Sequence, residues 1–214
     1  MEKILTELHL LKHPFYRDWM EGKLTHAQLR DYAAQYQHHV DAFPRYLGAI
    51  HSNCGDPAVR KILLENLNDE EGVTHGEPHP VLWKKFALGL GDTGSVDSTP
   101  RAAIRNVVDS FFACSRSSLA EGLGALYAYE SQVPEIAESK IEGLKNRYGV
   151  TDAASLSFFE AHRTADVYHR EALKKLLEEL PENEKLQARA AAERAARALW
   201  DFLTDVHGRN AIAA

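Results

Sequence analysis

The sequence is poor in cysteine, with only Cys54 and Cys114 among 214 residues. At most one disulfide bond can form, which excludes a disulfide-stabilised secreted scaffold and favours a reducing, cytoplasmic compartment. Long apolar runs are also missing, since no segment approaches the roughly 18 apolar residues that a membrane-spanning helix requires. We therefore expect no membrane partner, and the first residues do not have the layout of a signal peptide.

Positive charge is scarce as well. Lys and Arg total 25 against 31 Asp and Glu, which gives a formal net charge of -6. Binding to nucleic acid depends on a basic surface that releases phosphate counterions, so we expect no nucleic-acid partner. The chain also lacks the glycine-rich loops of nucleotide-binding proteins and the nucleophile motif of α/β-hydrolases. What it has in abundance is histidine, at 11 residues.

Signals for β-strands are absent, because no alternating apolar stretch exceeds about four residues. Helical periodicity runs through the chain instead. Thr25 and Gln28 form a capping box that begins a helix toward residue 53, and Asp56-Pro57 begins the next. Further helices are predicted over 102–129, 152–180 and 185–207. These features predict one all-α domain over residues 1–207, followed by a frayed tail at 208–214.

The sharpest chemical motif is formed by His162, Asp166 and His169. At about 100° per residue, offsets of four and seven positions place all three side chains on one stripe of a helix. Imidazole and carboxylate ligands together suit iron, manganese or zinc. The alternative interpretation is a solvated or hydrogen-bonded polar face.

A metal in a helical bundle also needs ligands from facing helices. Glu130 is a candidate because it lies among aromatic and apolar residues, where an unpaired charge would be costly; a buried acid paired with arginine is the alternative. The acidic run 68–71, followed by His75 and His79, offers a further carboxylate and imidazole. Three carboxylates and three histidines would hold two divalent metals, a set suited to activating oxygen.

Several segments resemble the PqqC-like proteins of the haem-oxygenase-like superfamily, and in particular the branch that contains the chlamydial protein associating with death domains. The resemblance covers roughly residues 8–180. The segments that carry it are His13-Pro14-Phe15-Tyr16, residues 32–40, Phe43-Pro44-Arg45-Tyr46, residues 79–83, residues 127–132 and the stripe His162/Asp166/His169.

The resemblance implies a seven-helix, haem-oxygenase-like bundle that holds two divalent metals, Fe/Fe or Fe/Mn, in place of haem. It also implies that O2 and an external reductant are consumed to make para-aminobenzoate for folate biosynthesis. In that group an internal tyrosine is thought to supply the ring and an internal lysine the amino nitrogen. Matched by motif, these residues are Tyr16 and Lys140. The implied metal ligands are Glu70, His79, Glu130, His162, Asp166 and His169.

The spacing of the first implied ligand pair leaves an alternative open. Glu70 and His79 are nine residues apart, about half a turn around a straight helix, so they can share a metal only if the chain breaks between them. Glycine and proline at positions 72, 76 and 78 favour such a break. In an unbroken helix, Glu71 and His75 at i and i+4 are the better pair.

The positions of Lys140 and Tyr16 also leave alternatives open. Lys140 lies ten residues beyond Glu130, about 15 Å along a straight helix, so the chain must bend at Pro134 for the amine to approach the metals. Tyr32 and Tyr129 compete with Tyr16 as the reacting tyrosine.

Two other functions stay open at this stage. One is a haem-oxygenase-like diiron oxidase that acts on a diffusible amino-acid-like or aromatic substrate, with Tyr16 and Lys140 only lining its pocket. The other is an interaction module that binds partner helices, as the name of the chlamydial relative suggests. A homodimer is also left open, and the reductant donor is not identified.

Overall fold

The computed structural model describes residues 1–73, 76–91 and 99–208, apart from the side chains of residues 164–167. All regular structure in this part is helical, which confirms the all-α prediction. None of the helices described is long and apolar enough to cross a membrane. The elements are α1 (Glu2–Glu7), the 3-10 turn η1 (Leu10–Lys12), α2 (Pro14–Glu21), α3 (His26–Asn53), α4 (Pro57–Glu70), α5 (His79–Gly89), α6 (Ala102–Ser117), α7 (Leu119–Glu130), α8 (Val133–Arg147), α9 (Ala153–Glu179) and α10 (Glu182–Gly208).

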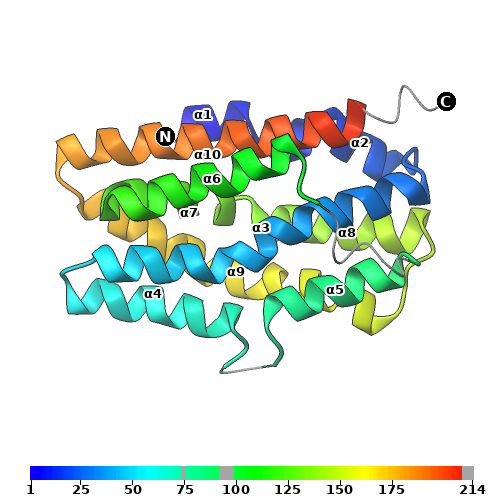
Figure 1. Ribbon diagram of the computed structural model, residues 1–214, viewed down its shortest axis with the longest axis horizontal. Helices are drawn as coiled ribbons and strands as arrows, with labels where there is room; N and C mark the ends of the chain where they lie inside the picture. Colours follow the sequence, from blue (N-terminus) through cyan, green and yellow to red (C-terminus); the bar gives the residue numbers. More distant parts are fainter. Residues whose placement is uncertain (74–75, 92–98, 209–214) are drawn as a thin grey trace.

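The longer helices run roughly along the longest axis of the molecule (Figure 1). Helix α10 and the short α1 lie along one edge, whereas α4 and α5 follow one another along the opposite edge (Figure 1). Helix α3 packs against both α4 and α5, and α9 packs against α5, α7 and α8. Helix α9 therefore contacts the helices that carry most of the predicted site residues.

Local sequence signals begin the helices where they were predicted. The Thr25 hydroxyl accepts the backbone N–H of Gln28, and the Gln28 side chain accepts the backbone N–H of Thr25, so the capping box is confirmed. Asp56 caps α4, with proline in its first turn, and Asp152 caps α9. Each of these signals acts within three residues, so it does not depend on tertiary packing.

Two helix boundaries differ from the sequence-based expectation. The stretch 102–129 is divided, because Ser118 is extended (φ -153, ψ 164) and its hydroxyl caps α7 by accepting the Glu121 N–H. The chain also breaks at residues 131–132, so Pro134 lies in the first turn of a new helix rather than at a kink. Helix α10 continues to Gly208, and the rest of the predicted tail, 209–214, lies outside the described residues. The single domain over residues 1–207 stays a prediction.

Close packing of α7 on α10 depends on small side chains. A Cβ at Gly124 would lie 2.1 Å from the carbonyl oxygen of Ala188, far inside van der Waals contact. The facing side of α10 is a stripe of fully buried alanines at positions 188, 191, 192, 195 and 196. With no room between the two backbones, α7 is held rigidly, and Glu130 stands at its last position.

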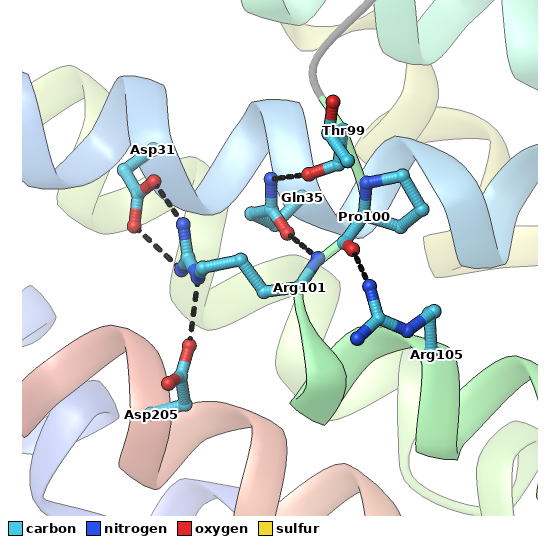
Figure 2. A network of polar contacts seen from close by, with 7 residues as sticks. All are labelled: Asp31, Gln35, Thr99, Pro100, Arg101, Arg105 and Asp205. Atoms are coloured by element: carbon cyan, nitrogen blue, oxygen red, sulfur yellow. Dashed lines mark hydrogen bonds and ion pairs between the residues drawn. The ribbon is translucent and has the colours of Figure 1, made fainter.

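Arg101 ties the opposite end of α10 to α3 (Figure 2). Its guanidinium donates to both carboxylate oxygens of Asp31 at 2.6 and 2.8 Å, and to Asp205 of α10 at 2.9 Å. Gln35 accepts the Arg101 backbone N–H at 2.9 Å and donates to the carbonyl of Thr99 at 3.2 Å (Figure 2). One residue before α6 thus joins three helices.

Candidate metal centre

Glu70, His79 and His162 come together in the core from three helices. Glu70 is the last residue of α4, His79 is the first of α5, and His162 lies midway along α9. His79 Nδ1 is 3.0 Å from Glu70 Oε2, and His162 Nε2 is 3.8 Å from Glu70 Oε1. One ligand atom from each residue lies within 4.8 Å of the others, and all three side chains are buried. This geometry is that of a group that could hold a metal ion.

The break between α4 and α5 is what allows Glu70 and His79 to meet. Gly72 has a positive φ of 67°, and a Cβ there would lie 2.5 Å from the backbone of Glu77, so glycine permits the tight return of the chain. Of the alternative pair, Glu71 is exposed, and His75 lies outside the described residues. The structure therefore brings together Glu70 and His79, although their role as ligands stays a prediction.

The electrostatics of this group suit a cation. Burial, followed by the neighbouring His79, holds the pKa of His162 well below its usual range, so the imidazole is neutral. His162 Nδ1 donates to the carbonyl of Phe158 at 2.7 Å, which leaves Nε2 as the nitrogen facing Glu70. Among the described residues, Glu70 pairs with these imidazoles and with no lysine or arginine. A buried carboxylate beside two imidazoles, of which that of His162 is neutral, fits a divalent metal.

Two further predicted ligands are buried beside this group. Glu130 accepts a hydrogen bond at Oε1 from the Asn66 amide, with a distance of 2.8 Å. His169 Nε2 lies 3.2 Å from Asp69 Oδ2. Both contacts lead to α4, within one turn of Glu70. The side chain of the sixth predicted ligand, Asp166, lies outside the described residues.

Sequence reasoning did not single out Asn66, and it treated Asp69 only as part of an acidic run. The available signal was their spacing, since positions 66, 69 and 70 share one face of a helix.

Lys140 is buried in a box of aromatic rings. Its ammonium nitrogen donates to the hydroxyl of Tyr32 at 2.5 Å. The same nitrogen lies 4.8 to 5.7 Å from the centroids of five rings, those of Tyr16, Tyr32, Tyr36, Trp83 and Phe159. Burial lowers the pKa of Lys140 to about 7. Because α8 begins anew at Val133, the amine reaches the interior rather than extending along the line of α7.

The tyrosines around Lys140 are linked by hydrogen bonds. The hydroxyl of Tyr32 donates to that of Tyr16, and burial raises the pKa of both phenols. The hydroxyl of Tyr36 accepts a hydrogen bond from that of Tyr129, and burial raises the pKa of Tyr36. All four phenols are therefore buried together, and the three with a resolved pKa are neutral at physiological pH.

A cavity of about 20 Å³ lies between the aromatic rings around Lys140 and His162 of the Glu70/His79/His162 group. Tyr16, Tyr36, Tyr129, Lys140 and His162 line it together with six apolar residues. This space is enough for about one water molecule. The cavity places the predicted tyrosine and lysine in the same enclosure as one of the predicted metal ligands.

The cavity is closed on one side by the N-terminal segment. Leu10 of η1 lines it, and the backbone N–H of Leu10 donates to the buried side chain of Gln132 at 2.8 Å. The Gln132 amide in turn donates to the carbonyl of Ala128 in α7 at 2.7 Å. Gln132, with Leu5 and His9, also lines a surface pocket. Gln132 therefore connects the segment that lines the cavity to α7.

Of the paired histidines 38 and 39, His39 is fully buried, among five rings that include Tyr129. Burial lowers its pKa to about 3, so it is neutral. Its Nδ1 is 3.4 Å from the hydroxyl of Tyr46. His39 is thus a core residue beside the cavity and is not part of the Glu70 group.

The fold and the buried group define a helical bundle with a candidate metal site, and the family comparison gives its class. Residues 30–201 match the family described as iron-containing redox enzymes. The match covers well over half of the chain, so the protein belongs to this family. The family makes it an oxidative enzyme and, with the buried Glu/His/His group, one suited to bind iron.

Individual proteins that are similar to this chain include enzymes with a named activity. The 4-aminobenzoate synthase of Nitrosomonas europaea is 43% identical, over 97% of this chain and 89% of that protein. The 4-aminobenzoate synthase of Chlamydia trachomatis is 40% identical, over 95% of this chain and 88% of that protein. A Shewanella denitrificans domain of unknown function, described as having a haem-oxygenase-like fold, superposes with a TM-score of 0.83 at 19% identity, covering 99% of this chain and 91% of that one. These matches confirm the family resemblance and the fold.

Proposed function

We propose that the protein is a 4-aminobenzoate synthase that takes the aromatic ring from Tyr16 and the amino nitrogen from Lys140. The relatives from Nitrosomonas europaea and Chlamydia trachomatis, which are 43% and 40% identical to this chain, are named for that activity. The tyrosine side chain already has the carbon skeleton of 4-aminobenzoate, namely a six-membered ring with one attached carbon and a heteroatom opposite. The product would serve folate biosynthesis.

The cavity of about 20 Å³ is the observation that carries the proposal. It has room for a molecule the size of water or dioxygen and no room for an aromatic substrate. A cavity of this size favours a ring that comes from its wall over one that enters from solvent. Tyr16 lines the cavity and Tyr32 does not, which supports Tyr16; Tyr129 also lines it, and there the motif match favours Tyr16.

Six residues would hold two metals, Fe/Fe or Fe/Mn: Glu70, His79, Glu130, His162, Asp166 and His169. Bound metals would supply the activation of O2, with electrons from an external reductant. The buried carboxylates and imidazoles described above, with His162 neutral, provide the mixed oxygen and nitrogen donor set that iron and manganese accept.

The chain itself prepares the amine and keeps water out. With a pKa of about 7, a large fraction of Lys140 is unprotonated near neutral pH, and the free amine is the nucleophilic form. Tyr32 accepts a hydrogen bond from this amine and donates one to Tyr16, so it links the source of nitrogen to the source of the ring. The rings of Trp83 and Phe159 cover the amine from the other sides.

Isotope labelling of the protein tests the proposal directly. The chain is produced with ring-13C tyrosine and ε-15N lysine, loaded in parallel with ferrous iron alone and with ferrous iron plus Mn²⁺, and exposed to O2 and reductant, with no small-molecule substrate added. We expect 4-aminobenzoate that carries both labels, in an amount of at most one molecule per chain. Product that draws its ring from an added unlabelled aromatic compound would refute the internal source, and an absence of any product would refute the synthase function.

Single substitutions test which residues supply the ring and the nitrogen and which bind iron. Tyr16→Phe should abolish product while iron still binds, whereas Tyr46→Phe, which changes a buried tyrosine outside the cavity lining, should keep both. Lys140→Met should abolish product, and Lys145→Met, on the exposed side of the same helix, should not. His162→Ala should lose iron as well as product. Product with normal yield from Tyr16→Phe would refute the tyrosine assignment.

A further inference from the structure

Asn66 is a buried polar residue that contacts one predicted ligand of the candidate metal centre, Glu130. It lies on α4 with 4% of its surface exposed, one helical turn before Glu70. A buried amide must satisfy its hydrogen bonds within the protein. Its Nδ2 donates to Glu130 Oε1 at 2.8 Å, across 64 positions of sequence. The contact therefore joins α4 to the end of α7.

The location of Glu130 explains why such a contact matters. Glu130 is the last residue of α7, and the chain turns at residues 131–132 directly after it. A glutamate has three side-chain torsions, so its carboxylate can take many positions unless something holds it. A hydrogen bond to one carboxylate oxygen selects one of these positions.

The chemical nature of the donor is equally informative. An arginine or lysine at position 66 would also hold Glu130, but it would neutralise the carboxylate and repel a metal cation. A side-chain amide donates a hydrogen bond without bringing a charge. Asn66 thus orients the carboxylate and leaves its negative charge for a cation.

Helix α4 couples this contact to the other half of the centre. Positions 66 and 70 are separated by one turn, so Asn66 and Glu70 lie on the same face of α4. Glu70 contacts His79 and His162, while Asn66 contacts Glu130. One rigid helix therefore sets the distance between the carboxylate it carries and the carboxylate it holds.

We propose that Asn66 is a positioning residue that holds Glu130 in the orientation required for metal binding. The inference rests on the metal site of the proposed function but not on the reaction carried out there. Contacts of this kind commonly change metal affinity by about 10- to 100-fold when they are removed.

The test uses Asn66→Leu, which removes the donor and keeps a side chain that branches at the same carbon. Ferrous iron is titrated anaerobically into the full-length protein, and the Mössbauer spectrum of the loaded protein is recorded. We expect iron affinity to fall by about 10- to 100-fold and the quadrupole splitting of the bound iron to change. Asn66→Ala is a second variant that removes the donor without adding an apolar branch, and the same loss is expected.

Leu63→Ala is the matched control. Leu63 is buried on the same helix one turn before Asn66, and its side chain has no polar atom that could form a hydrogen bond. It should lower stability toward urea while leaving iron affinity and the spectrum unchanged. A loss of iron affinity in Leu63→Ala equal to that in Asn66→Leu would overturn the proposal, since the effect would then follow the packing of α4.

A double-mutant cycle supplies the decisive comparison. In a Glu130→Ala background, Asn66→Leu should change the residual iron affinity by less than about twofold, because the side-chain oxygen through which Asn66 acts is gone. An equal loss in both backgrounds, or an Asn66→Leu variant with native affinity and spectrum, would refute the inference. A wild-type protein that binds iron but makes no 4-aminobenzoate would contradict the proposed function alone.

Discussion

Replacing Lys140 with methionine should stabilise the metal-free protein while destroying its proposed activity. Folding moves this amine from water into a box of aromatic rings, where 4% of the residue remains exposed. A drop in its pKa from 10.5 to about 7 corresponds to about 5 kcal/mol by which the fold disfavours the charged form. Cation–π attraction from the surrounding rings opposes this by about 2 kcal/mol. The expected net gain for Lys140→Met at acidic pH is therefore about 3 to 5 kcal/mol.

The dependence on pH has a definite sign. Below pH 7 the amine is protonated in both the folded and the unfolded chain, so the full penalty is present. Between pH 7 and 10.5 the folded amine is neutral while the unfolded one is still charged. Unfolding then takes up a proton, and the stability of the wild-type protein rises with pH by about 1.4 kcal/mol per unit. The advantage of Lys140→Met should therefore be greatest below pH 7 and shrink as pH increases.

The assay is urea unfolding of chelator-treated protein at several pH values between 6 and 9, with the free energy extrapolated to water. Lys145→Met is the control, because Lys145 lies on the same helix in an exposed ion pair, 3.7 Å from Glu160, and should change stability by less than about 1 kcal/mol. The reasoning fails if Lys140→Met is no more stable than the wild type at pH 6, or if its advantage does not decline toward pH 9.

Two other predictions follow from packing and from the wall of the cavity. Gly124→Ala should lower stability by about 1 to 3 kcal/mol, because its Cβ would meet a backbone carbonyl of α10 at 2.1 Å; an unchanged melting temperature would contradict the close approach of α7 and α10. Gln132→Ala removes the acceptor that holds the Leu10 backbone over the cavity, so an amine-reactive reagent should modify Lys140 faster. Peptide mapping of metal-free protein measures that rate, with exposed lysines as the internal reference, and an unaltered rate would show that the wall opens elsewhere.

The helices were predictable where their signals are local. The capping box at Thr25 and the caps at Asp56 and Asp152 need only neighbouring residues, and all three appear in the structure. The break at Ser118 was not predictable, because apolar residues continue with helical period on both sides of it. Its reason lies in backbone geometry, since an extended serine with a capping hydroxyl ends one helix and begins the next.

The residues of the candidate site were likewise predictable where they share one helix and not where they come from different helices. His162 and His169 were placed together by periodicity because they share one helix. Glu70 and His79 belong to two helices joined by a tight turn, so their contact depends on a chain path that spacing alone leaves open. The burial of Lys140 was beyond sequence reasoning as well, since a lysine on an amphipathic helix is normally solvated.

Contacts between residues far apart in the sequence were the hardest feature to predict. Asn66 and Glu130 are separated by 64 positions, and nothing local to either residue signals the other. Among the residues the structure describes, the cavity joins side chains from α2, α3, α7, α8 and α9 with η1, so it exists only after the bundle has assembled.

Glu70 and Glu130 bury negative charge and a protonated Lys140 buries positive charge, and each destabilises the metal-free fold. A bound cation would change the contribution of both kinds of charge. Glu70 and Glu130 are the last residues of their helices, where the helix dipole places negative partial charge beside each buried carboxylate. A cation held by these residues would relieve this repulsion, so metal should raise the free energy of unfolding. The same cation repels a protonated Lys140, which lines a cavity in common with His162. We therefore expect metal loading to lower the pKa of Lys140 further and to favour the neutral amine that the proposed reaction consumes.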